Sequence, residues 1–171
     1  MPKAYISIGS NVDRERNVRS AVSALSGHYG PLVLSPVYES AAFGFDGDPF
    51  YNLVCGFTTA DTVAVLVRQL HAIERRHGRL PGDKRFSPRT LDLDILLYDD
   101  LVRHDDFDIP RSDIIEHSFV LRPLCDLAPT MQHPELNQTF SQLWSQLGAR
   151  HALRQVALNL QDVTNHRHDV S

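Results

Sequence analysis

The sequence predicts an α+β protein with a ferredoxin-like βαββαβ core and additional C-terminal helices. Two observations predict this class. β-Prone runs alternate with segments whose apolar residues recur at helical spacing, which gives the order βαββαβ over residues 4–98. The chain of 171 residues also suits one core, and its 42% hydrophobic and 22% charged residues are ordinary values for a globular protein.

The first half of the core follows from apolar patterning and turn residues. A β-prone run at residues 4–8 predicts the first strand, which a turn-forming triplet ends at residues 9–11. Residues 32–38 predict a second strand, and Pro36 within it favours an edge strand or a bulge. Between them, four apolar residues at helical spacing predict a helix that ends near Gly30: Val18, Ala21, Val22 and Leu25.

The second half of the core repeats this order. Residues 50–59 predict a strand, and Asp61 or Thr62 can cap a helix that ends near Gly78. A loop rich in glycine, proline and arginine follows. Residues 90–98 then form the most regular strand pattern in the chain.

Beyond the core, the sequence predicts two helices and a loose end. One helix spans 112–127 and is expected to break around Pro123 or just after it, and another spans 140–147. No linker separates two cores, so we expect residues 1–150 to form a single domain. Residues 151–171 are expected to form an extension that frays.

Charge and composition exclude several classes of protein. The chain has 17 Lys and Arg against 21 Asp and Glu, a balance that argues against a general nucleic-acid binder. No apolar run approaches the roughly 20 residues needed to cross a bilayer, and the N-terminus lacks the apolar region of a signal peptide. We therefore expect a cytoplasmic monomer that acts on small molecules, with Cys55 and Cys125 as buried thiols.

The strongest local signal is the pair Asp92 and Asp94. Strand geometry puts these two carboxylates on one face and the intervening apolar side chains on the other. Like charges on one strand face repel, so the pair favours a compensating cation such as Mg²⁺. A solvated strand face with ion pairs to arginines is the alternative.

A basic run precedes this pair. Six cationic residues lie within fifteen positions, with Asp83 as the only acid among them: Arg75, Arg76, Arg79, Lys84, Arg85 and Arg89. The first two are interpreted as solvating the end of a helix. The other four are candidates for phosphate binding, because guanidinium groups match phosphate oxygens. The chain has neither of the common glycine-rich phosphate loops, so side chains would have to bind a magnesium polyphosphate.

The segment Arg85–Leu96, with the sequence RFSPRTLDLDIL, resembles the signature of 6-hydroxymethyl-7,8-dihydropterin pyrophosphokinases of folate biosynthesis. Further family-like segments lie in family order over residues 4–130: Ile8–Asn11, Pro49–Asn52, Ile73–Arg79 and Phe119–Pro129. The resemblance implies that residues 1–150 are a pyrophosphokinase-like domain. It also implies that the β,γ-diphosphate of ATP is transferred to the hydroxymethyl group of the dihydropterin, with release of AMP.

The resemblance further implies roles for particular residues. Asp92 and Asp94 match the ligands of two Mg²⁺ ions, and with Arg79 and Arg89 they match the catalytic residues. The nucleotide side comprises Arg79, Lys84, Arg85, Arg89, Ile95, Arg111 and His117. On the pterin side, Phe50 and Phe119 would sandwich the ring, Asn52 would bind its polar edge, and backbone contacts would come from Ser40, Ala41 and Phe43.

The chain departs from the family pattern at positions that fall mostly on the nucleotide side: Pro81, Phe86, Ser87, Arg111, Ser112 and His117. Lys84 or Arg85 could replace a lost loop charge, and Arg111 could bind phosphate in place of a histidine. Two alternatives therefore stay open. One is a non-catalytic paralogue that binds pterin, and the other is a ferredoxin-like module that binds RNA.

Overall fold

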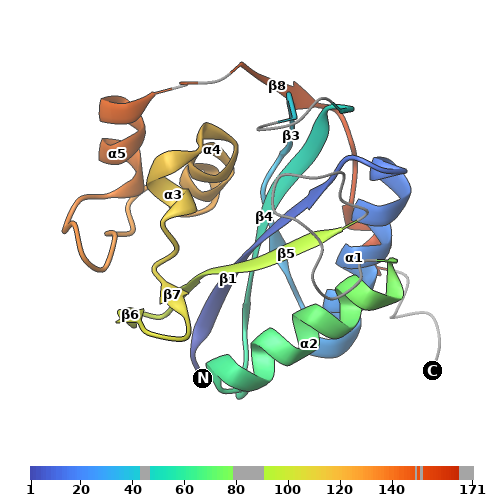
Figure 1. Cartoon of the computed structure of the whole chain (residues 1–171), viewed down its shortest axis with the longest axis horizontal. Coiled ribbons are helices and arrows are strands. Elements are labelled where there is room, and N and C mark those ends of the chain that lie inside the picture. Colours follow the sequence, from blue (N-terminus) through green and yellow to red (C-terminus); the bar gives the residue numbers. More distant parts are fainter. Residues whose placement is uncertain (43–46, 79–90, 149, 151, 166–171) are drawn as a thin grey trace.

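The computed structural model describes residues 1–42, 47–78, 91–148, 150 and 152–165. Its centre is an antiparallel sheet in the order β5-β1-β4-β3-β8, and the short strand β2 also pairs with β4 (Figure 1). The strands of this sheet are β1 (Lys3–Ser10), β2 (Val33–Leu34), β3 (Val37–Ser40), β4 (Phe50–Thr58), β5 (Asp92–Tyr98) and β8 (Leu153–Val156).

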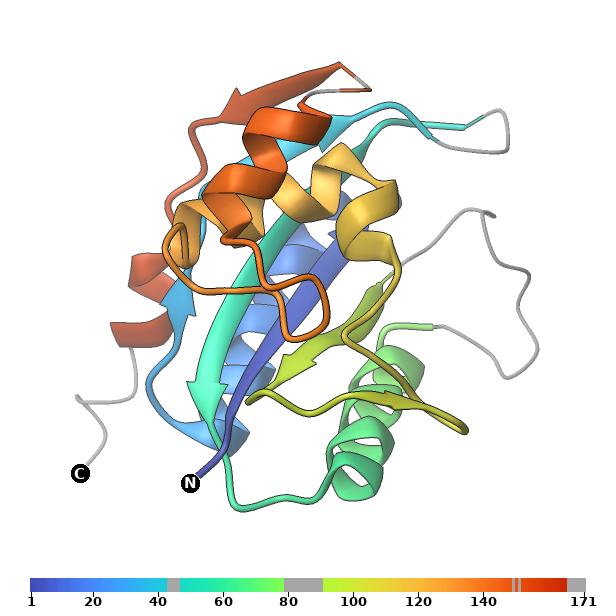
Figure 2. The same ribbon diagram turned by 90° about the vertical axis from the view of Figure 1, so that its left-hand side faces the viewer.

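Helices cover both faces of the sheet (Figures 1 and 2). On one face, α1 (Arg14–Tyr29) and α2 (Val63–Arg76) bury their apolar stripes against β1, β4 and β5. The other face carries a second apolar cluster, which three helices complete: α3 (Asp113–Glu116), α4 (Ser118–Leu127) and α5 (Phe140–Leu147). A small hairpin of β6 (Arg103–His104) and β7 (Asp108–Ile109) connects β5 to α3.

The predicted order of strands and helices over residues 4–98 is confirmed, with one refinement. The second strand is divided at Ser35 and Pro36 into β2 and β3. Ser35 keeps the divided strand attached to β4, because its N–H donates to Val54 O and its hydroxyl accepts from Val54 N, both at 2.9 Å. Of the two candidate caps of α2, Thr62 makes the bond, accepting from Val65 N.

The helix predicted over 112–127 breaks at a different residue from the one expected. His117 is extended and separates α3 from α4, whereas Pro123 lies inside α4. A proline removes one backbone donor from a helix, but the residues around Pro123 are buried in the second apolar cluster. Packing of this face therefore outweighs the loss of one hydrogen bond.

Within the C-terminal segment after residue 150, the described residues 152–165 contact the core. β8 pairs with β3, Leu160 is buried, and α6 (Gln161–Asn165) lies against α1. Arg19 of α1 donates to Asn159 O and forms an ion pair with Asp162. Residues 166–171 lie outside the described part of the chain.

The two cysteines and the helix lengths also bear on the expectations from the sequence. Cys55 and Cys125 are both buried free thiols, as expected. Among the described residues, no helix combines the length and apolarity that a membrane crossing requires.

Candidate active site

Asp92 and Asp94 share one face of β5, as the strand pattern predicted. They pair with Gly9 and Ser7 of β1, and their side chains lie on the face that α3 and α4 cover. The apolar residues that alternate with the two aspartates pack into the core on the opposite face: Leu91, Leu93 and Ile95. Because successive side chains of β5 point to opposite faces, the strand separates the two carboxylates from the apolar core.

Asp94 lies in an environment that disfavours its charge. Its side chain is 24% exposed, and its Oδ1 is 3.6 Å from Arg111 Nη2. Burial raises the pKa of Asp94 to about 8, the negative charge of Asp92 adds to this, and the Arg111 guanidinium opposes it. The carboxylate pair therefore gains from additional positive charge, which is the property expected of a divalent-cation site.

Arg111 links β5 to α3. Its backbone N–H donates to Leu96 O at 3.0 Å, and its Nε donates to Asp113 Oδ2 at 2.9 Å. The contact with Asp94 is longer than the one with Asp113. The guanidinium is thus anchored to Asp113 through Nε, and its Nη2 faces Asp94.

A pocket of about 340 Å³ lies beside Asp94 and Arg111. It opens between β5, α2 and the β6–β7 hairpin. Apolar side chains form much of its wall: Val67, Leu70, Leu93, Ile95, Phe107 and Ile109. Three polar residues, His71, Asp106 and Asp108, complete the lining. Apolar walls with a few charged groups are typical of small-molecule sites.

The predicted pterin-side residues meet in the sheet. Asn52 of β4 is buried and its Nδ2 donates to Ser40 Oγ of β3 at 2.7 Å. Gly9 is the β1 partner of Asn52, and a Cβ at Gly9 would lie 3.3 Å from Asn52 Oδ1 and 3.9 Å from the ring of Phe50. The glycine thus leaves space beside the amide oxygen and the aromatic ring.

Both predicted sides of the site share this sheet face. Gly9 pairs with Asp92 on one side and with Asn52 on the other, so the row Asp92–Gly9–Asn52 crosses three strands. Ser40 and Phe50 are register partners at the adjoining ends of β3 and β4. The sheet therefore brings residues from four segments of the chain to one place.

The other predicted aromatic residue, Phe119, lies in the first turn of α4. Its ring stacks on the ring of His117, with centroids 4.8 Å apart and an interplanar angle of 13°. His117 is buried, at the break between α3 and α4. The family resemblance implies different substrates for these two residues, whereas the structure joins their rings in one stack.

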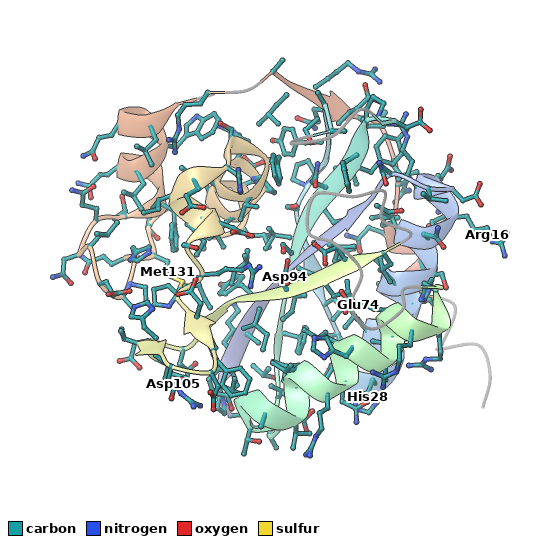
Figure 3. The ribbon with its side chains drawn as sticks, viewed as in Figure 1. Arg16, His28, Glu74, Asp94, Asp105 and Met131 are labelled. Carbon is teal, nitrogen blue, oxygen red and sulfur yellow. The ribbon has the colours of Figure 1, made fainter. Side chains whose placement is uncertain are left out.

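Glu74 of α2 was not predicted as a site residue. It is buried, and its Oε2 accepts a 2.9 Å hydrogen bond from Leu93 N, between Asp92 and Asp94. Figure 3 labels Glu74 and Asp94 on the two sides of β5. Glu74 thus fixes the backbone of the carboxylate pair from the opposite face. In the sequence it lies within the family-like segment Ile73–Arg79, next to the arginine-rich segment.

A second group of residues carried no signal as a cluster in the sequence. Asp113, Glu116 and His117 bring ligand atoms within 4.8 Å of one another. Because Asp113 is also ion-paired to Arg111, this group adjoins the carboxylate pair.

Five predicted site residues lie outside the part of the chain that the structure describes: Phe43, Arg79, Lys84, Arg85 and Arg89. Ala41, also predicted, follows the last residue of β3.

The chain has relatives in sequence. It is 36% identical over 149 residues to the folic acid synthesis protein fol1 of Schizosaccharomyces pombe, a match that covers 84% of this chain and 20% of that protein. It is 32% identical over 152 residues to the 2-amino-4-hydroxy-6-hydroxymethyldihydropteridine pyrophosphokinase of Bacillus subtilis, covering 84% of this chain and 90% of the relative.

The fold also has solved counterparts. The crystal structure of wild-type Plasmodium falciparum HPPK-DHPS with SDX-DHP superposes with a TM-score of 0.67 at 14% identity, over 85% of this chain and 43% of that one. The chain spans about a fifth of the length of fol1 and similar relatives. The family model described as 7,8-dihydro-6-hydroxymethylpterin-pyrophosphokinase (HPPK) matches residues 5–129. This match covers most of the chain, which therefore belongs to the HPPK family.

Proposed function

We propose that the chain transfers diphosphate from ATP to the hydroxymethyl group of 6-hydroxymethyl-7,8-dihydropterin and releases AMP. One observation carries the proposal. The carboxylate pair Asp92–Asp94 lies on the same sheet face as the Asn52–Ser40 hydrogen bond, and Gly9 separates the two. A site for a metal-bound polyphosphate and a site for a polar heterocycle are thus adjacent.

Asp92 and Asp94 would hold the Mg²⁺ ions, of which the resemblance implies two. The raised pKa of Asp94, caused by burial and by Asp92, supports this assignment because a bound cation would remove the repulsion. When bound, Mg²⁺ neutralises phosphate charge and aligns the phosphate chain for in-line attack.

The chain's own residues would bind and orient the pterin. Phe50 and Phe119 offer faces for stacking on a flat heterocycle, and Asn52 offers its amide to the polar edge. Because Asn52 Nδ2 already donates to Ser40, the hydrogen bond sets the orientation of this amide. Ala41 and Phe43 would add the backbone contacts expected at the end of β3.

On the nucleotide side, the base would enter the pocket beside Ile95, and the phosphates would extend towards Arg111, which also lines it. His117, buried at the break between α3 and α4, would complete this side. The long contact between Arg111 and Asp94 can be exchanged for a phosphate oxygen while Asp113 retains the guanidinium. Arg79, Lys84, Arg85 and Arg89 would provide the remaining positive charge, with Arg79 and Arg89 among the catalytic residues together with Asp92 and Asp94.

The finer structural assignments are also proposals. The strand order β5-β1-β4-β3, with α1 and α2 on one face, supports a ferredoxin-like core. The monomeric state and the cytoplasmic location stay predictions.

Product analysis tests the proposed reaction. The chain is incubated with ATP, MgCl₂ and 6-hydroxymethyl-7,8-dihydropterin, and the nucleotides and pterins are separated by chromatography. We expect AMP and the pterin diphosphate in equal amounts, and neither product when EDTA replaces MgCl₂ or when the pterin is omitted. ADP in place of AMP would contradict diphosphate transfer.

Two further outcomes identify the alternatives. Pterin binding without binding of a non-hydrolysable ATP analogue in MgCl₂ would indicate a non-catalytic paralogue. Submicromolar binding of single-stranded RNA at physiological salt would indicate a ferredoxin-like binding module.

A further inference from the structure

Arg14, the first residue of α1, contacts three separate groups at the site end of β3 and β4. Its Nη2 forms a 2.8 Å ion pair with Glu39 Oε2 of β3. Its Nη1 donates to Pro49 O, immediately before β4, at 3.1 Å. The guanidinium also lies 3.9 Å from the ring centroid of Tyr51. One side chain thus connects both strands and the residue that precedes the second.

The contacts of Arg14 alternate along the strands with the predicted pterin residues. Glu39 and Tyr51 are direct register partners, and the neighbouring pairs are Ser40 with Phe50 and Tyr38 with Asn52. Because successive side chains on a strand point to opposite faces, Arg14 holds the back of the segment whose front carries Ser40, Phe50 and Asn52.

Two other segments strengthen this connection. Arg154 of β8 is the register partner of Glu39 and contacts its second carboxylate oxygen at 3.2 Å. Asn11, just before α1, donates its Nδ2 to Asp48 O at 3.1 Å. The chain after β1 and the strand β8 therefore both attach to the ends of β3 and β4.

Arg19 on the same helix provides a natural comparison. The Arg19 side chain is 32% exposed and forms ion pairs with Glu15 and Asp162, whereas that of Arg14 is 29% exposed. Isolated surface ion pairs contribute little to stability. The two arginines are about equally exposed, but only Arg14 is attached to the strands that carry the predicted pterin residues.

We propose that Arg14 is a positioning residue for the pterin subsite, which it holds from the opposite face of the sheet through Glu39, Pro49 O and Tyr51. The inference rests on the proposed function. It predicts that Arg14 governs pterin affinity through the placement of Phe50 and Asn52 and has no part in binding the nucleotide. Small displacements of positioning groups are sufficient for large kinetic effects.

The test compares Arg14→Ala, Arg14→Lys and Arg19→Ala in the full chain. We expect Arg14→Ala to raise the KM for the dihydropterin roughly tenfold, with kcat and the KM for ATP changing less than about twofold. Lysine retains the charge but cannot serve all three partners, so Arg14→Lys should recover part of the loss. Arg19→Ala should leave all three constants unchanged.

Glu39→Gln and Arg154→Ala extend the series. Glu39→Gln should raise the pterin KM less than Arg14→Ala does, and Arg154→Ala should have the smallest effect because its side chain is 68% exposed. Pterin fluorescence, with a non-hydrolysable ATP analogue and MgCl₂ present, measures the dissociation constant directly. The same order of effects is expected in both assays.

The outcomes separate this inference from the proposed function. Normal wild-type turnover with an unchanged pterin KM in Arg14→Ala would overturn this inference alone. If Arg14→Ala does not fold, the pterin affinities of Arg14→Lys and Glu39→Gln test the inference instead. Unchanged pterin affinity in both variants would overturn the inference. A wild-type chain that binds no pterin would overturn both.

Discussion

On the proposed pterin side of the site, neutral groups come from the strands of the sheet, and the buried amide of Asn52 is hydrogen-bonded to Ser40. On the proposed nucleotide side, Asp92 and Asp94 share a strand face, and burial with mutual repulsion raises the pKa of Asp94. The first side has its side-chain hydrogen bond satisfied within the chain. The second gains stability only when positive charge is added, so the two sides should respond differently to substitution.

Removing a carboxylate should have the largest effect. We expect Asp92→Ala or Asp94→Ala to lower AMP formation by about a thousandfold or more, because the metal would lose a ligand. The fold should persist in both, as judged by circular dichroism. Asp100→Ala, which removes an exposed acid just after β5, is the control and should retain activity. Normal turnover in both site variants would refute the proposed metal site.

Phe50→Ala tests the neutral side. Stacking of a heterocycle on an aromatic ring is worth enough that its loss should raise the pterin KM by about 10- to 100-fold. The KM for ATP should change little. Phe50→Tyr retains the ring and serves as the matched control. If the KM values for ATP and pterin rise together, the two sides are not independent.

Asp94→Asn should separate stability from activity. In the folded chain, burial and Asp92 raise the Asp94 pKa to about 8, so the folded state retains a proton that the unfolded state loses near 3.8. Stability is therefore lost as pH rises between these values. In EDTA at pH 8, the inactive Asp94→Asn variant should melt about 2–5 °C above the wild type.

The pH dependence provides the control for this variant. At pH 5 the difference in melting temperature between Asp94→Asn and the wild type should be smaller, because less of the wild type's pH-dependent loss of stability has occurred there. If the melting temperatures of Asp94→Asn and the wild type differ by the same amount at every pH in this range, Asp94 is ionised in the folded chain.

The smallest effect is expected at His104, in the β6–β7 hairpin that borders the pocket proposed for the nucleotide. Hydrogen bonds to Asp108, the larger cause, and to Glu135 raise the pKa of His104. The stabilisation that these hydrogen bonds give to the folded chain is therefore complete below the unfolded-state pKa of about 6.5. It is lost as pH rises through the pKa of His104 in the folded state. His104→Gln should lower the melting temperature slightly at pH 6 and leave it unchanged at pH 9. An equal loss at both pH values would exclude a role for its charge.

Local patterns in the sequence predicted the parts of the site that local geometry decides. The two-residue period of a strand is sufficient to place Asp92 and Asp94 on one face. Arg14 and Glu74 carried no such signal, because their roles arise only when helices dock on strands distant in the sequence. The Asn52–Ser40 hydrogen bond likewise depends on the register between β3 and β4.

The errors in the predicted fold have the same origin. Pro123 predicted a helix break by its missing donor, but burial of the surrounding residues keeps α4 intact. β8 is short and has mostly polar or half-exposed side chains, so no apolar pattern marked it. Pairing with β3 makes it a strand, and only tertiary structure reveals that pairing.

The pairing of β3 with β8 has a consequence for biosynthesis. Most of the chain separates these strands, so during translation the outer edge of β3 stays open until the ribosome has delivered residues 153–156. Exposed strand edges recruit foreign strands, and contacts between distant segments form slowly. Until then Arg154 cannot reach Glu39, and the open edge of β3 favours aggregation of the nascent chain.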